Sequence, residues 1–143
     1  SVTNEAPTEI AASATLTPSG VDESLTADLR FASGVTAHLT TNMGPGAPFR
    51  SEMKLIGTRG EITFINPLAP HHALVPGVLT SSQGRRAEIS PISTYTYQLA
   101  AVWSALQSGT TLPTEGEMIL RQQIALDEIY AQAGLKHLRY VQT

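Results

Sequence analysis

The sequence predicts an α+β domain in which the strands come first and the helices last. Three observations carry this prediction. Up to about residue 90, short segments alternate apolar and polar residues with a period of two, and turn residues separate these segments. From residue 95 onward the apolar period changes to 3.6, which is typical of helices. The expected architecture is an open, predominantly antiparallel sheet with helices packed on one face and its other face available for dimerisation.

The composition is that of one ordinary globular domain, which we place over residues 1–143. Of these residues 41% are hydrophobic and 15% charged, and the formal net charge is −3. That charge argues against a nucleic-acid partner, and no apolar run approaches the roughly 20 residues that span a bilayer. There is no cysteine, so no disulfide and no thiolate site is expected. These features predict a cytoplasmic protein without a membrane partner.

The first three strands are expected at 9–17, 24–31 and 35–41. The first is rich in small residues and ends at a Pro-Ser-Gly turn. The other two alternate cleanly and are joined by three residues ending in Gly34. A three-residue loop with Gly34 in the left-handed region pairs Phe31 with Val35, which keeps both apolar sets on one face.

A second hairpin is expected from 51–56 and 61–65 around a turn that begins and ends with glycine. Its register places Leu55 opposite Ile62 and Met53 opposite Phe64. Two further strand-like pieces follow at 73–81 and 85–90, and Pro76 restricts the first of them to an edge or a bulge. The core under the helices is expected from one side of the sheet, at Leu25, Phe31, Leu39, Leu55 and Phe64.

Two helices close the chain. The first, 95–108, is amphipathic through Leu99, Val102, Trp103 and Leu106, and Gly109 ends it. The second is expected to open with a capping box between Thr114 and Glu117 and to stop at Gly134. Its apolar face is formed by Ile119, Leu126, Ile129, Tyr130 and Ala133. Glu115 and Glu117 fit dipole and capping roles, and His137 near the helix end fits a structural role.

The face of the sheet away from the helices is expected to be less polar than a fully solvated face needs to be. Its members are β-branched or moderately polar: Thr26, Arg30, Thr36, His38, Thr40, Ile56, Thr63 and Ile65. We expect a homodimer formed face to face through this surface, with His38 as an interface residue rather than a base. The alternative is a face that is merely solvated.

The stretch 57–70, GTRGEITFINPLAP, ends in an Asn-Pro loop that leads to His71 and His72. Such a loop places polar groups at a sheet end, where binding residues are common, although it also fits a plain hairpin corner. Adjacent histidines on an extended segment point to opposite sides, so no metal site is expected. Tyr95 and Tyr97 open the first helix and can donate to an anionic or hydroxylated ligand. Packing on the sheet explains them equally well.

No complete catalytic constellation is present: the sequence has neither a G-x-S-x-G elbow nor an H-E-x-x-H pair. The turn Gly44-Pro45-Gly46 is not a phosphate-binding turn, because the third glycine and a following helix pattern are missing.

Four segments together resemble the C-terminal domain of the glucose–fructose oxidoreductase, inositol dehydrogenase and MocA-like (Gfo/Idh/MocA) family, with the dihydrodiol dehydrogenase-like branch as the nearest match. They are LRFASGVTAHLTTNM, GTRGEITFINPLAP, the helix from TYTYQL to SGTTLPT, and DEIYAQAGL. The resemblance extends from about residue 10 to residue 135. It implies a two-domain enzyme in which an upstream Rossmann domain binds NAD or NADP. The C-terminal domain then closes the substrate pocket and dimerises through its open sheet.

The sequence also departs from the family pattern in two respects. The glycine-rich cofactor turn is absent, and so is the Glu-Lys-Pro segment that carries the family's catalytic lysine, because neither Lys54 nor Lys136 precedes a proline. We therefore expect these residues to be a fragment without its Rossmann domain. It would carry no catalytic, cofactor or metal residue and would not transfer hydride alone.

The residues expected at the rim of the substrate pocket are Asn66, His71, His72, Tyr95 and Tyr97. The intact enzyme would act on a sugar-, polyol- or diol-like alcohol. A stand-alone, non-catalytic dimeric binding or assembly module fits the composition and strand pattern equally well.

Overall fold

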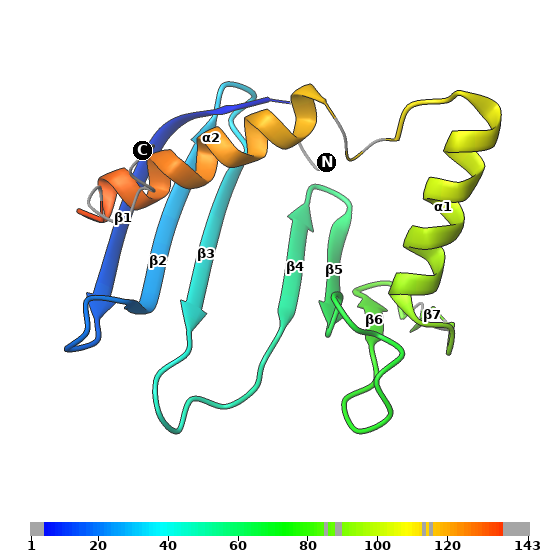
Figure 1. The fold of residues 1–143 in the computed structure, drawn as a ribbon. Coiled ribbons are helices and arrows are strands. Elements are labelled where there is room, and N and C mark those ends of the chain that lie inside the picture. Colours follow the sequence, from blue (N-terminus) through cyan, green and yellow to red (C-terminus); the bar gives the residue numbers. More distant parts are fainter. Residues whose placement is uncertain (1–4, 85, 88–89, 113, 115, 136–143) are drawn as a thin grey trace. The chain divides into compact units, whose positions relative to one another are not determined.

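The computed structural model describes residues 5–84, 86–87, 90–112, 114 and 116–135. Within these residues seven strands precede two helices (Figure 1), which confirms the predicted α+β class. The strands are β1 (Pro7–Leu16), β2 (Asp22–Phe31), β3 (Thr36–Asn42), β4 (Glu52–Gly57), β5 (Gly60–Ile65), β6 (Val78–Ser81) and β7 (Arg86–Ala87). The helices are α1 (Thr94–Ser108) and α2 (Glu117–Gln132).

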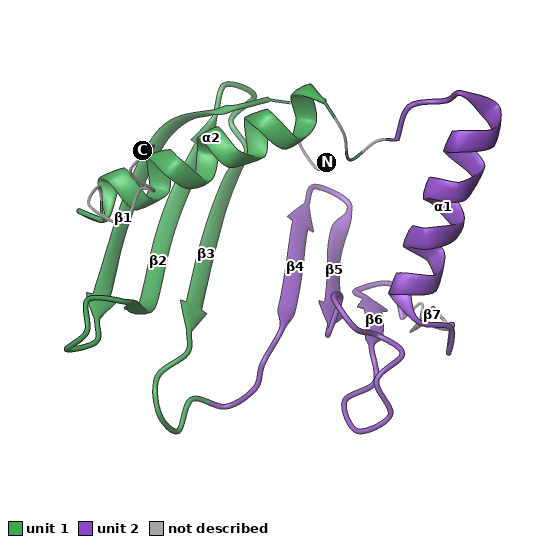
Figure 2. Ribbon diagram, in the orientation of Figure 1, with its two compact units in different colours: residues 1–47, 113–143 green, residues 48–112 purple. Residues whose placement is uncertain are grey.

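Every described strand pair is antiparallel, but the strands form two sheets rather than one. One has the order β1-β2-β3 and the other β4-β5-β6-β7. The chain likewise divides into two compact units, residues 1–47 with 113–143 and residues 48–112 (Figure 2). Compact units are not necessarily domains, so the expectation of one C-terminal domain stays a prediction.

In the first unit the hairpin of β2 and β3 has the predicted register. The Phe31 amide donates to the Val35 carbonyl at 2.9 Å, and Gly34 takes φ 83°. Ala27 pairs with Leu39, so the apolar residues of both strands share one face. The expected first strand is present as β1, which pairs along β2.

Helix α2 lies across this apolar face of the three-stranded sheet (Figure 1). Leu25, Ala27 and Ile129 are buried where the two meet. Ala27 is only 1% exposed, and its methyl side chain lets the helix approach the sheet closely. The core is smaller than expected, because Leu39 stays 42% exposed and Phe31, Leu55 and Phe64 are only half-buried.

The end of α2 is fixed by the pair Gly134 and Leu135. Gly134 has φ 81°; its amide donates to the Ala131 carbonyl, and the Leu135 amide donates back to Tyr130. These two bonds form a Schellman motif, and the apolar residue after the glycine, Leu135, is buried. The predicted stop at Gly134 is confirmed, whereas His137 lies outside the described residues.

The capping box predicted for α2 is wrong. The N-cap is Gly116, with φ 64° and ψ −131°, and no side chain of the described residues caps the helix. Glycine adopts this conformation readily. The N-cap therefore lies two residues after Thr114, the predicted N-cap. The Glu117 carboxylate instead accepts from Arg121 one turn later, at 3.0 Å. Glu115 lies outside the described residues.

In the second unit, Leu55 pairs with Ile62 and Met53 with Phe64, as predicted. Strand β6 starts only at Val78, after Pro76, so the expected strand over 73–81 is about half as long as predicted. The residues between β5 and β6 form a loop, which we call the 66–77 loop.

Helix α1 matches its predicted span and ends at Gly109 in the left-handed conformation. None of its side chains is buried, and its apolar residues Leu99, Val102, Trp103 and Leu106 are exposed.

Candidate functional site

One buried side chain organises the 66–77 loop. Asn66 is 2% exposed and has φ 50°, a left-handed conformation that asparagine tolerates better than most residues. Its side-chain amide donates to the carbonyl oxygens of Ala69, at 2.8 Å, and Val75, at 2.5 Å. Its Oδ1 accepts from the Ala69 amide at 3.3 Å. Both amide hydrogens and the oxygen are therefore engaged within the loop.

The same loop contacts the start of α1. The backbone amide of Thr94 donates to Nδ1 of His71 at 3.4 Å, and the Thr94 hydroxyl donates to the Leu68 carbonyl at 3.3 Å. Since Nδ1 accepts a hydrogen bond, a neutral His71 ring carries its proton on Nε2. This contact joins the two sequence regions expected to form the pocket rim.

The remaining predicted residues lie close to this contact in the chain. His72 is exposed, and its Nδ1 accepts from the Val75 amide at 3.4 Å. Tyr95 and Tyr97 are 70% and 51% exposed, so neither is buried against the sheet. The Tyr97 hydroxyl donates to Ser90 Oγ at 2.8 Å. Contact of any of these residues with a substrate stays a prediction.

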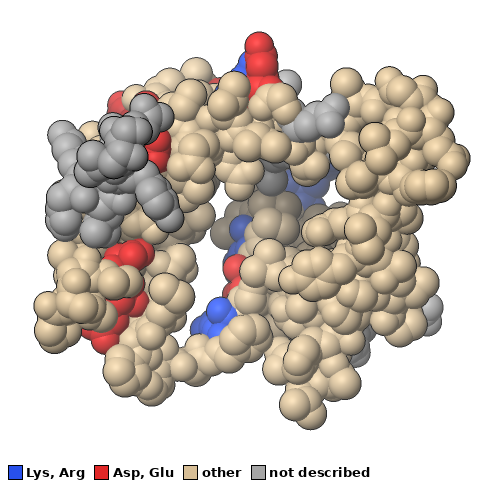
Figure 3. Space-filling view, viewed as in Figure 1, with Lys and Arg blue, Asp and Glu red and all other residues tan. Residues whose placement is uncertain are grey.

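This candidate site is uncharged. Residues 66–77 and 94–108 include no Asp, Glu, Lys or Arg, and the face of α1 seen in Figure 3 shows no charged side chain. Its polar groups are phenols, imidazoles and hydroxyls. Aromatic faces combined with neutral donors suit a ligand rich in uncharged hydroxyl groups. Across the described parts of the chain, no three His, Asp or Glu side chains cluster closely enough to hold a metal ion.

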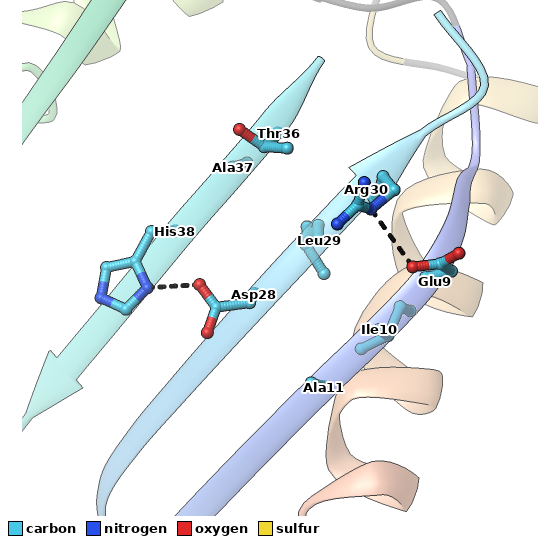
Figure 4. A pocket seen from close by; sticks show the side chains of 9 residues that line it. All are labelled: Glu9, Ile10, Ala11, Asp28, Leu29, Arg30, Thr36, Ala37 and His38. Carbon is cyan, nitrogen blue, oxygen red and sulfur yellow. Dashed lines mark hydrogen bonds and ion pairs between the residues drawn. The ribbon is translucent and has the colours of Figure 1, made fainter. Parts of the chain in front are cut away.

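A second candidate surface lies on the three-stranded sheet, on the side away from α2. A shallow hollow of about 510 Å³ there is crossed by two pairs of side chains (Figure 4). His38 Nδ1 is 2.7 Å from Asp28 Oδ1, and Arg30 Nε is 3.2 Å from Glu9 Oε2. All four side chains are exposed, so each pair adds little stability alone. The lining is completed by Ile10, Ala11, Leu29, Thr36 and Ala37.

Sequence reasoning missed three participants. Asp28 could have been found, because the register set by Phe31 and Val35 places it opposite His38. Ser93 caps α1 by accepting from the Tyr95 amide at 3.3 Å, and a Ser just before a helix is an ordinary capping signal. The structural role of Asn66 had no such signal, because it depends on two carbonyls that only the folded loop brings together.

A comparison with known protein families concerns the first part of the chain. Residues 1–63 match the family described as the GFO/IDH/MocA C-terminal domain. This match confirms the family resemblance over that part of the chain. The match covers 63 of the 143 residues, and the strands-then-helices order of the chain is that of an α+β domain.

Two solved structures share the fold. The aldose-aldose oxidoreductase of Caulobacter crescentus, solved in complex with glycerol, superposes on 93% of this chain with a TM-score of 0.75 and 17% identity. A putative oxidoreductase of Thermotoga maritima superposes on 89% with a TM-score of 0.58 and 21% identity. At these identities the likeness is one of fold. The chain spans only 41% and 38% of those two chains.

A comparison with curated protein sequences gives no match. In the described residues neither helix is long and apolar enough to cross a membrane.

Proposed function

We propose that this chain is the C-terminal domain of a longer NAD(P)-dependent oxidoreductase that acts on a sugar-, polyol- or diol-like alcohol. The observation that carries the proposal is the uncharged site formed by the 66–77 loop and the start of α1. It combines exposed phenols with an imidazole whose neutral form carries its proton on Nε2. The match of residues 1–63 and the fold shared with two oxidoreductases support the class of reaction.

The described residues do not fit a nicotinamide dinucleotide. Dinucleotide sites place the pyrophosphate at a glycine-rich turn between a strand and a helix. Here β3 leads through Gly44 and Gly46 into another strand, β4. The cofactor therefore belongs to another part of the longer protein, where it would supply the hydride chemistry.

In this proposal the chain binds and orients the alcohol. His71 Nε2–H and the Tyr95 hydroxyl would donate to substrate oxygens. The Tyr97 hydroxyl, which donates to Ser90 Oγ, would accept from a substrate hydroxyl, and the phenol rings would pack against the C–H groups of a sugar-like substrate. His72, an exposed residue of the same loop, would contact the edge of the substrate. Catalytic proton transfer would come from residues outside this chain, so the chain alone would be inactive.

The same proposal includes a cytoplasmic homodimer formed through the polar face of the three-stranded sheet. That face opposes α2 and presents short β-branched side chains, among them Thr26, Thr36 and Thr40. On that face the charges of Glu9 and Arg30 cancel, and the Asp28 carboxylate is hydrogen-bonded to His38, so two identical faces can meet without strong repulsion.

The test is a nicotinamide-linked assay of the longer protein with a panel of alcohols. Glycerol and neutral aldoses should be turned over better than carboxylated analogues of equal size, because no cation in the site would pair with a carboxylate. Absence of nicotinamide-dependent turnover across neutral polyols, sugars and diols would remove the proposal. The remaining candidate would then be a stand-alone binding module, which is favoured by the absence of a dinucleotide-binding turn among the described residues.

A further inference from the structure

Asn66 stands out by its backbone as well as its burial. Among the described residues it is the one non-glycine residue with positive φ, at 50°. Its own amide donates to the Ser51 carbonyl at 2.6 Å, so the backbone is anchored beside the start of β4. A buried polar side chain with all its bonds satisfied restrains its surroundings strongly, because each broken bond leaves a buried group unpaired.

The bonds of Asn66 tie together both ends of the loop. Its side chain holds Ala69, three residues on, and Val75, nine residues on. The Gly77 amide then closes the loop on the Pro70 carbonyl at 2.8 Å. His71 lies between the two carbonyls that Asn66 holds, so its backbone position depends on that side chain.

We propose that Asn66 is a positioning residue: it holds the 66–77 loop so that His71 Nδ1 receives the Thr94 amide, which leaves Nε2–H as the ring's donor. The inference rests on the proposed function only for what that donor binds, an oxygen of a neutral hydroxylated substrate. Asn66 then acts through His71 rather than by touching the substrate itself.

The arrangement is a chain of two dependent contacts, from Asn66 to the loop and from the loop to α1. Two features make the second contact sensitive to the first. The Thr94–His71 bond is long, at 3.4 Å, so a small shift of the loop breaks it. Thr94 also holds the loop through the Leu68 carbonyl, which lies between Asn66 and His71 in sequence.

The test uses the 143-residue chain and nitrogen NMR of the imidazole of His71, together with hydrogen exchange of the Thr94 amide. In the wild type we expect the neutral ring to be the Nε2–H tautomer. The variant Asn66→Asp keeps the side-chain shape and tolerance of positive φ but loses both amide donors. It should abolish the tautomer preference and speed Thr94 exchange by about tenfold or more.

Three further variants make the result specific. Leu68→Ala, in the same loop at a side chain that is 77% exposed, should leave both signals as in the wild type. His71→Asn retains an acceptor near the position of Nδ1 and should keep Thr94 protected, whereas His71→Ala should not. Asn66→Gly tests the same loss without adding a carboxylate, in case Asn66→Asp unfolds the unit.

The inference would be overturned if both Asn66 variants kept the wild-type His71 tautomer and the wild-type exchange rate of the Thr94 amide. It would also be overturned if the Thr94 amide exchanged equally fast in His71→Asn and His71→Ala. None of these measurements needs a substrate or a cofactor. A positive result alongside an inactive longer protein would therefore reject the proposed function while keeping the positioning role.

In an active longer protein, the double variant Asn66→Asp/His71→Ala should have the same kcat/KM as His71→Ala alone, because Asn66 acts through His71. Additive losses would contradict this.

Discussion

The phenol of Tyr130 on α2 donates a hydrogen bond to the carboxylate of Asp22 at the start of β2, across 3.2 Å. The bond ties the helix to the sheet it covers, between residues 108 positions apart. Burial, and after it the negative charge and hydrogen bond of Asp22, raise the pKa of Tyr130 above its ordinary value of 10.0. All three effects favour the neutral phenol of the folded state.

This raised pKa predicts a loss of stability at alkaline pH. The folded state holds the Tyr130 proton more tightly than the unfolded state, so the contribution is complete below pH 10 and falls as pH rises through the folded pKa. Urea unfolding from pH 8 to 11 should show a steeper alkaline decline in the wild type than in Tyr130→Phe. At neutral pH that variant should lose about 1 kcal/mol for the missing bond.

The exposed Tyr95 provides the control, since Tyr95→Phe should keep the wild-type alkaline decline. An identical pH dependence in the wild type and Tyr130→Phe would show that Asp22 and burial do not act on this phenol.

The contact between α2 and the sheet should be sensitive to Ile129. Ile129→Ala should lower the free energy of unfolding by about 2–4 kcal/mol, because it leaves a cavity against Leu25 and Ala27. Ile124→Ala, on an exposed position of the same helix, should cost far less. Chemical denaturation measures both, and equal losses would mean that the helix does not pack through Ile129.

Gly60 should resist substitution for two separate reasons. Its φ of 132° disfavours any side chain, and a Cβ would collide with the Ser82 hydroxyl. Gly60→Ala should destabilise the protein by about 1–3 kcal/mol. Gly84 also has positive φ but open space around its Cβ position, so Gly84→Ala should cost less.

Removing the Ser82 hydroxyl as well tests whether its collision with the new Cβ at position 60 causes part of the loss. The double variant Gly60→Ala/Ser82→Ala should recover part of the loss measured by denaturation for Gly60→Ala alone. A double variant that is less stable than the sum of its single changes would contradict this account.

The proposed dimer face can be tested by a single charge. Thr40→Glu places a carboxylate on the polar face of β3 and should yield a mass of one chain by sedimentation at micromolar concentration, where the wild type should give two. Gln123→Glu, an exposed change on α2, adds the same charge elsewhere and should stay dimeric. A one-chain mass for the wild type would remove the dimer proposal.

If His71 and Tyr97 lie at the rim of the substrate pocket, changing either should weaken substrate binding in the longer protein. His71→Ala and Tyr97→Phe should each raise KM by about 5–20-fold, the size of one lost hydrogen bond to a substrate hydroxyl. Steady-state kinetics with a neutral polyol measure this. Unchanged kinetics in both variants would exclude the two side chains from the rim.

The sequence predicted best where two local signals agreed. The register of Phe31 with Val35 followed from the alternating pattern and from a glycine that the turn required, and Gly109 marked the end of α1 in the same way. Both depend on neighbouring residues, so no knowledge of the rest of the fold was needed.

Prediction from the sequence failed where a residue distant in the chain determined the local structure. The expected strand from 73 was too long because the Val75 carbonyl bonds the Asn66 side chain instead of a neighbouring strand. The capping box failed because Gly116 takes a conformation that starts α2 later. For the candidate site, the cluster of loop and helix start was expected from sequence order, but the contact of His71 with Thr94 was not.

The absence of Asp, Glu, Lys and Arg from the 66–77 loop and α1 has a consequence for solution behaviour. Attraction between formal charges weakens as ions are added, whereas hydrogen bonds between neutral groups and contacts with aromatic rings hardly change. Affinity for a hydroxylated ligand should accordingly be about the same in dilute buffer and in concentrated sodium chloride.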